Sequence, residues 1–296
     1  MLDFKPLCPG FGLECLGIDL AEPLPDSVFA EIDAAFFRGQ VLVFRSQSLK
    51  PEEFVAFARR FGEPEPHVID QFHHPDDPNI LILSNVVIDD EPQGLADAGT
   101  YFHTNYSYLE VPARATMLYS IEVPSRGGHT LFANQYAAYD GLPDSLKKQV
   151  ESLVAIHHYG NRNDLDEASR TAASALTDEQ KAKLPLIAHP IVRVHPVTGR
   201  KMLYAVSGTS FGIAGMPDDE ARKLLDLLAA HATQERYRYS HAYRVGDVVL
   251  WDNASLLHAA TLTDPDDPRT LWRITVKEPL LAADAVLAPT FASRSM

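Results

Sequence analysis

Three residues of this sequence could share one metal ion. His103 and Asn105 are two positions apart, and in a strand such residues point to the same face. His258 lies far downstream, after a predicted strand and turn at Asp247–Asp252. Two histidines and one oxygen donor on one face of an octahedron leave three positions open, as an iron centre needs in order to hold a chelating cosubstrate and oxygen. The spacing alone is weak evidence, because the chain has 12 histidines and a hydrogen-bonded interior histidine is the commoner case.

Two arginines follow the second histidine. Arg269 and Arg273 are four residues apart in a segment that predicts a strand, so both guanidinium groups would lie on one face. An arginine fork donates two parallel hydrogen bonds to a carboxylate, and the pair therefore predicts an anion site. A pair of exposed arginines on an acidic protein explains the same spacing equally well.

The elements that must position these residues alternate between helices and short strands. Apolar periodicity predicts helices at Asp26–Arg38, Pro51–Phe61, Ala137–Val154 and Asp218–Ala232. Short apolar runs separated by turns predict strands, among them Val41–Phe44, Ile80–Ser84, Ala115–Tyr119, Thr130–Ala133, Tyr237–Tyr243, Val248–Trp251 and Trp272–Lys277. This order predicts a mostly β fold, a sandwich or jelly-roll core with flanking helices.

Composition excludes several classes of function. With 26 basic and 40 acidic residues the net charge is −14, which repels a phosphate backbone and argues against nucleic acid as a partner. The sequence has neither an apolar run long enough for a membrane span nor the pattern of a signal peptide. Its 2 cysteines predict reduced thiols rather than a disulfide framework. We therefore expect a cytoplasmic protein without a membrane partner.

Seven stretches of the sequence match a known pattern in order and spacing. They are Gly17–Pro23, Val41–Arg45, Phe57–Gly62, Phe102–Ser107, Gly127–Phe132, His189–Lys201 and Trp251–His258. Together they resemble the taurine dioxygenase/2,4-dichlorophenoxyacetate dioxygenase family of Fe(II)- and 2-oxoglutarate-dependent oxygenases. The resemblance covers nearly the whole chain and includes the family's His-Thr-Asp element and its glycine-glycine-x-threonine turn.

The resemblance implies a fold and a set of roles. It implies one domain over 1–296 with a double-stranded β-helix core, jelly-roll or cupin-like, and substrate-lid insertions near 68–99 and 161–183. It implies Fe(II) and 2-oxoglutarate as cofactors, O₂ as a reactant, and a small organic anion as the substrate, which is hydroxylated and in some cases thereby cleaved. The implied iron ligands are His103, Asn105 and His258; the implied 2-oxoglutarate contacts are Thr130 and Arg269; and the implied substrate contacts are Arg273, His67, Tyr106 and Tyr108.

Asn105 departs from the family pattern, which has a carboxylate at this position. An amide oxygen is neutral and binds a hard cation more weakly than a carboxylate does. The residue has three explanations: an engineered change that traps a complex, a natural variant that still turns over, or a member that has lost oxygenase activity and kept a binding role. The presence of Thr130, Arg269 and Arg273 favours a competent or engineered oxygenase.

Two other classes of function compete with the oxygenase. In the first, the chain is a binding protein that holds a small carboxylate without oxidising it. In the second, the same histidines hold zinc for hydrolysis, which would leave Arg269 and Thr130 without a purpose. The resemblance also implies a homo-oligomer, a dimer or tetramer.

Overall fold

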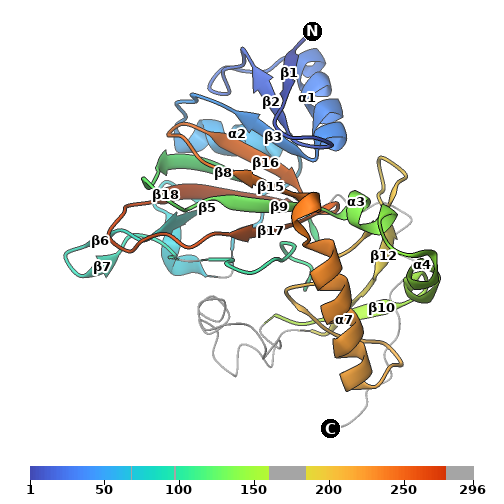
Figure 1. The fold of residues 1–296 in the computed structure, drawn as a ribbon. Coiled ribbons are helices and arrows are strands. Elements are labelled where there is room, and N and C mark those ends of the chain that lie inside the picture. Colours follow the sequence, from blue (N-terminus) through green and yellow to red (C-terminus); the bar gives the residue numbers. More distant parts are fainter. Residues whose placement is uncertain (68, 97, 160–184, 278–296) are drawn as a thin grey trace.

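The computed structural model describes residues 1–67, 69–96, 98–159 and 185–277 (Figure 1). The expected lid at 161–183 lies outside the described residues. No helix among the described residues is long and apolar enough to cross a membrane.

An eight-stranded sheet forms the centre of the molecule (Figure 1). Only the β2–β3 pair in it is parallel. In spatial order its strands are β1 (Asp3–Pro6), β2 (Leu13–Leu16), β3 (Val41–Phe44), β16 (Val248–Asp252), β8 (Ala113–Glu122), β18 (Thr270–Lys277), β5 (Asp77–Ser84) and β4 (His73–His74).

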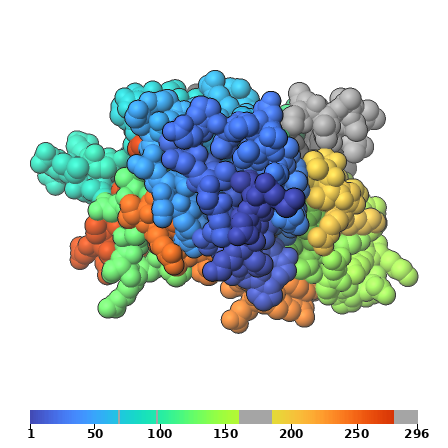
Figure 2. Space-filling view, turned by 90° about the horizontal axis from the view of Figure 1, so that it is seen from above, coloured from blue at the N-terminus to red at the C-terminus, as the bar shows by residue number. Residues whose placement is uncertain are grey.

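Smaller sheets complete the β structure. The first has three strands in the order β15 (Arg238–His241), β9 (Thr130–Asn134) and β17 (Leu256–Ala260). The second runs β11 (Ile187–Pro190), β10 (Val154–His157) and β14 (Ser210–Ile213). Two hairpins pair β12 (Val192–Val194) with β13 (Lys201–Leu203), and β6 (Val87–Ile88) with β7 (Glu91–Pro92). The β6–β7 hairpin projects from the body of the molecule (Figures 1 and 2).

The helices lie outside this β structure. They are α1 (Asp26–Gly39), α2 (Pro51–Arg59), α3 (Gln135–Asp140), α4 (Asp144–Val150) and α7 (Asp218–Ala232), with 3₁₀ turns at Asp70–Phe72 and Glu235–Tyr237. The mostly β fold with few helices is confirmed. Two helices differ from the sequence prediction only in their last residues, and α7 has the predicted bounds.

The helical prediction over Ala137–Val154, with a second part beginning near Pro143, is correct only in part. The segment forms α3 and α4, and Val154 begins β10. Gly141 ends α3 where a Cβ atom would lie 2.0 Å from the hydroxyl oxygen of Tyr237, so the chain turns at a position that only glycine fits. Pro143 then precedes α4 at its N-cap position.

Side chains alternate along the central strands, so the two faces of the large sheet contribute to two separate cores. On β3, Leu42 and Phe44 join the cluster that packs under α1 and α2, which we call the helix-side core. Val41 and Val43 join the cluster between the large sheet and the β15–β9–β17 sheet, which we call the inter-sheet core. Successive strand residues point to opposite faces, so one run of four apolar residues serves both cores.

Candidate active site

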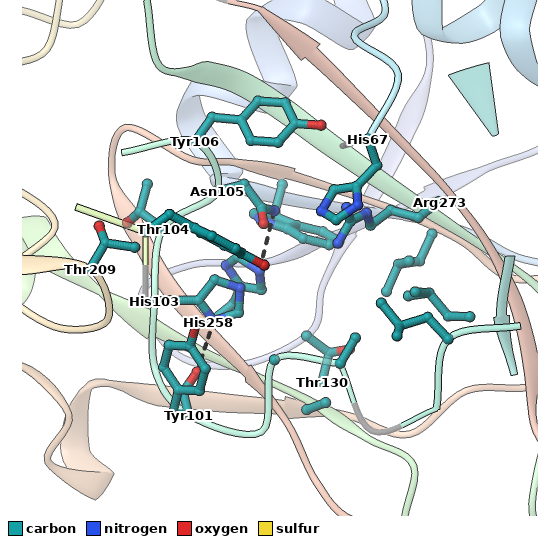
Figure 3. Close-up of a pocket in the computed structure, with 18 of the residues that line it drawn as sticks. His67, Tyr101, His103, Thr104, Asn105, Tyr106, Thr130, Thr209, His258 and Arg273 are labelled. Atoms are coloured by element: carbon teal, nitrogen blue, oxygen red, sulfur yellow. Dashed lines mark hydrogen bonds between the residues drawn. The ribbon is translucent and has the colours of Figure 1, made fainter. Parts of the chain in front are cut away.

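His103 and His258 lie side by side at the edge of the inter-sheet core. His258 is in the middle of β17, and His103 pairs with it through an isolated antiparallel bridge, each backbone N–H donating to the other's carbonyl at 2.9 Å. The imidazole centroids are 4.2 Å apart. The strand expected around His103 and Asn105 is therefore not formed, since Asn105 begins a turn. The single bridge still directs the side chains of His103 and His258 into one pocket (Figure 3).

His258 is buried, His103 is half-buried, and both imidazoles are neutral. Burial, followed by the charge of Arg273, lowers the pKa of His103 to about 4, although its hydrogen bond to the Tyr101 carbonyl acts the other way. Burial, followed by the nearby His103 and Arg273, lowers the pKa of His258 well below its usual value. The Tyr101 oxygen lies 2.8 Å from Nδ1 of His103 and can only accept, so Nδ1 carries the proton and Nε2 keeps its lone pair. That tautomer suits a metal ligand.

Asn105 lies between the two rings and a buried hydroxyl. Its Nδ2 donates to Oγ1 of Thr116 at 2.9 Å and is 3.3 Å from Nε2 of His258. Thr116 also accepts from Nδ2 of Asn253 at 2.9 Å and lies 3.1 Å from Oγ1 of Thr275. Two amide donors fill the lone pairs of Thr116, so its own proton is left for Thr275. This network fixes the amide of Asn105 from beneath the pocket.

Thr130 and Arg269 meet at another part of the same pocket. Thr130 is the first residue of β9, and Arg269 immediately precedes β18. The Nε of Arg269 donates to the carbonyl of Gly128 at 3.3 Å. Gly128 has φ 63°, and a Cβ atom there would lie 3.0 Å from the Arg269 side chain and 2.7 Å from Pro124. The second glycine of the predicted turn is thus needed for the close approach of Arg269.

A tyrosine that we did not predict completes this part of the site. The hydroxyl of Tyr243 lies 2.8 Å from Oγ1 of Thr130, and burial raises its pKa, so the phenol stays protonated. The ring of His241 packs against Tyr243 with centroids 4.7 Å apart, and His241 Nε2 lies 3.2 Å from Asp247, which also binds Arg45. The sequence did offer a signal for Tyr243. His241 and Tyr243 are alternate residues of a predicted strand, and such residues share a face.

Arg273 and a group of aromatic residues line the remainder of the pocket. His67 and Arg273 lie on the same side of the histidine pair (Figure 3). Burial and then the Arg273 charge lower the pKa of His67 strongly, so this imidazole is neutral. The predicted Tyr106 and Tyr108 both line the pocket, and Tyr101 and Tyr159, which were not predicted, line it as well. Arg269 lies outside β18, and the β18–β8 register shifts after Thr270, so the two arginines do not share the face of one regular strand.

Comparisons with known proteins identify the family of the chain. The sequence profile of the taurine catabolism dioxygenase TauD, TfdA family matches residues 3–275. The chain belongs to this family. The 2,4-dichlorophenoxyacetate dioxygenase of Cupriavidus pinatubonensis, which is alpha-ketoglutarate-dependent, is 34% identical over 281 residues, 92% of this chain and 96% of the relative. The (S)-phenoxypropionate/alpha-ketoglutarate-dioxygenase of Sphingobium herbicidovorans is 34% identical over 272 residues, 91% of this chain and 93% of the relative.

A solved structure extends the likeness to three dimensions. The crystal structure of AAD-2 with Mn(II) and N-oxalylglycine superposes with a TM-score of 0.79 at 31% identity, covering 95% of this chain and 98% of that one. TauD/TfdA family members are 2-oxoglutarate-dependent dioxygenases, and this chain is an enzyme of the same kind, with Fe(II) and 2-oxoglutarate as its cofactors.

The residues of the pocket fit a divalent ion only as a neutral donor set. Two imidazoles and one amide converge, and the described residues contain no group of three or more histidines, cysteines or carboxylates placed to hold a metal. Nδ1 of His258 is buried and has no hydrogen-bond partner among the described residues, whereas a ligating histidine usually donates its second N–H. The structure therefore agrees with the sequence in placing an amide, at Asn105, where the family pattern has a carboxylate.

Proposed function

We propose that this chain hydroxylates a small organic carboxylate that has an apolar or aromatic body, consuming 2-oxoglutarate and O₂. The observation that carries the proposal is the convergence of His103, His258, Thr130, Arg269 and Arg273 on one pocket. A cluster of neutral imidazoles beside two guanidinium groups suits a metal together with two anions. We further propose that the two facing sheets form a single jelly-roll domain and that the chain assembles as a dimer or tetramer.

Each part of the pocket has its own task in this proposal. His103, Asn105 and His258 would hold Fe(II), which when bound would activate O₂, the oxidant, and so couple loss of CO₂ from 2-oxoglutarate to attack on a C–H bond. Thr130 and Arg269 hold the far carboxylate of 2-oxoglutarate with a hydroxyl and a guanidinium, and Tyr243 keeps the Thr130 hydroxyl in place.

The substrate lies against Arg273. Its guanidinium pairs with the anionic group, and neutral His67 beside it adds a hydrogen bond without a competing charge. Tyr106 and Tyr108 offer ring faces and edges, with centroids 6.0 Å apart, and close the pocket to water. The two relatives described above are named for aryloxyalkanoic acids, which combine a carboxylate with an aromatic ring. Hydroxylation of a carbon that bears an ether oxygen gives a hemiacetal, which breaks the ether bond.

Succinate formation tests this proposal. The protein is incubated with Fe(II), 2-oxoglutarate and a panel of aryloxyacetates and aliphatic carboxylates, and succinate is measured beside the oxidised product. We expect the two in equal amounts for at least one substrate. A matched assay uses Asn105→Asp, which restores the family's carboxylate.

Asn105 favours a second candidate, a binding protein for small carboxylates. That candidate predicts succinate from Asn105→Asp alone, while the unchanged chain binds the carboxylates without turning them over. Succinate from neither protein would reject the oxygenase assignment of the pocket.

A further inference from the structure

The described residues at the histidine end of the pocket carry no negative charge. No aspartate or glutamate is among the described residues that line the pocket. The donors there are two imidazoles and the Asn105 amide, none of which is an anion, and the Thr116 and Asn253 groups beneath the amide are neutral too. Exposed carboxylates beyond about 10 Å are largely screened by salt.

A positive charge faces this neutral donor set. Arg273 lines the same pocket as His103, His258 and His67 (Figure 3). Among the described residues no carboxylate forms a salt bridge with Arg273, which adds a positive charge to the lining of the pocket. A divalent ion entering alone would lose its water for three neutral ligands beside a cation, which is unfavourable for a hard ion.

A dicarboxylate entering the same pocket meets the opposite situation. Arg269 and the Thr130 hydroxyl offer donors to its far carboxylate, and no described lining residue repels the anion. With its far carboxylate held there, an oxo-dicarboxylate would bring its other carboxylate and its keto oxygen, and with them one negative charge, to the histidine end. The dianion can therefore supply the charge that Asn105 does not provide.

We propose that Asn105 makes metal and 2-oxoglutarate binding mutually dependent, so that the dianion enters first and each ligand is held weakly without the other. This inference rests on the proposed function, which places both ligands in this pocket. Coupling between two ligands is reciprocal, so the factor by which the dianion strengthens the metal equals the factor by which the metal strengthens the dianion. A carboxylate at position 105 would supply part of the missing charge and reduce that factor.

Binding of Mn(II) tests the coupling without turnover. The six-line electron paramagnetic resonance signal of free Mn(II) is followed in titrations with and without saturating N-oxalylglycine, for the unchanged chain and for Asn105→Asp. We expect N-oxalylglycine to tighten Mn(II) binding about 100-fold or more in the unchanged chain, and about tenfold or less in Asn105→Asp, within or near the usual range of such coupling. Thermal unfolding of both proteins confirms that the near-isosteric change leaves the fold intact.

A second variant tests the role of the positive charge. Arg273→Gln in the unchanged background should tighten binding of Mn(II) alone several-fold, because it removes the repulsion. Arg200→Gln is the matched control, since Arg200 is exposed and paired with Asp140 at the surface, and it should leave Mn(II) binding unchanged. No change in Mn(II) binding on Arg273→Gln contradicts the electrostatic explanation.

The outcomes separate this inference from the proposed function. Equal coupling factors in the two proteins, or Mn(II) bound alone as tightly by the unchanged chain as by Asn105→Asp, overturn the inference and leave the site in place. Mn(II) bound with N-oxalylglycine by Asn105→Asp but not by the unchanged chain also overturns it. Failure of both proteins to bind Mn(II) with N-oxalylglycine overturns the proposed function along with the inference.

Discussion

The two faces of the large sheet carry different kinds of side chain, although the same strands supply both. On β8, Ala115 and Met117 point into the helix-side core, whereas Thr116 between them points to the pocket and holds Asn105. On β18, Ile274 joins the helix-side core, and its neighbour Arg273 lines the pocket. The helix-side face is sealed by apolar packing, and the pocket face buries polar groups that are held by one another. We therefore expect substitutions on the first face to change stability and those on the second to change binding.

Truncation of a helix-side residue should give the largest effect. Phe36 on α1 is fully buried and packs edge-on against Phe61, with centroids 5.4 Å apart. Phe36→Ala should lower the free energy of unfolding by about 3–5 kcal/mol, because it removes a buried ring and leaves a cavity. Chemical denaturation measures this change, and the folded fraction should keep the KM values of the unchanged chain. An altered KM for 2-oxoglutarate would show that the two faces are coupled.

Removal of Arg273 should have the opposite effect to Phe36→Ala, weakening binding without lowering stability. Arg273→Leu deletes the charge assigned to the substrate anion, and loss of such a charged hydrogen bond costs about 2–3 kcal/mol of binding, or roughly 30- to 150-fold in kcat/KM. The free energy of unfolding should stay the same or rise, since a cation beside buried histidines is lost. An uncharged substrate analogue serves as the control and should be affected much less. A loss of stability like that of Phe36→Ala would refute the distinction between the faces.

Lowering the pH should reduce stability through a group on the pocket side of the molecule. His189 on β11 supports the turn below the pocket through a 3.2 Å hydrogen bond to the Leu109 carbonyl. Burial, then the charge of Arg193, lowers the pKa of His189 to about 4. The unfolded chain therefore binds more protons than the folded one between about pH 6.5 and 4, and stability falls as the pH falls through this window.

His189 should account for about 1.3 kcal/mol of the unfolding free energy that is lost between pH 7.5 and 5.5. His189→Gln should reduce the pH dependence of the unfolding free energy by that amount. Phe36→Ala is the control, because it should lower stability at every pH without changing the slope. An unchanged slope in His189→Gln would place the acid sensitivity elsewhere, for example at neighbouring His157, whose pKa burial also lowers.

The sequence indicated the elements and the two histidines, because both depend on local pattern or on motif order. It did not predict the backbone around His103, since one bridge to β17 replaces the expected strand and only the folded partner determines that pairing. The same limit applies to Thr116, whose role depends on β8 lying beneath the turn at Asn105. Because side chains alternate along β8, Thr116 lies on the pocket face, but nothing in the local sequence showed which residue it would contact.

The smallest expected effect concerns Tyr243, one of the residues found only in the folded structure. Tyr243→Phe removes the hydroxyl that lies 2.8 Å from Thr130, and loss of one such hydrogen bond is worth about 1 kcal/mol. We expect about a fivefold increase in the KM for 2-oxoglutarate, with the KM for the substrate and the free energy of unfolding nearly unchanged. Tyr136→Phe is the matched control, because its hydroxyl makes a similar 2.9 Å contact with Thr198 away from the pocket. Equal KM values in both variants would show that Tyr243 packs against Thr130 without positioning it for 2-oxoglutarate.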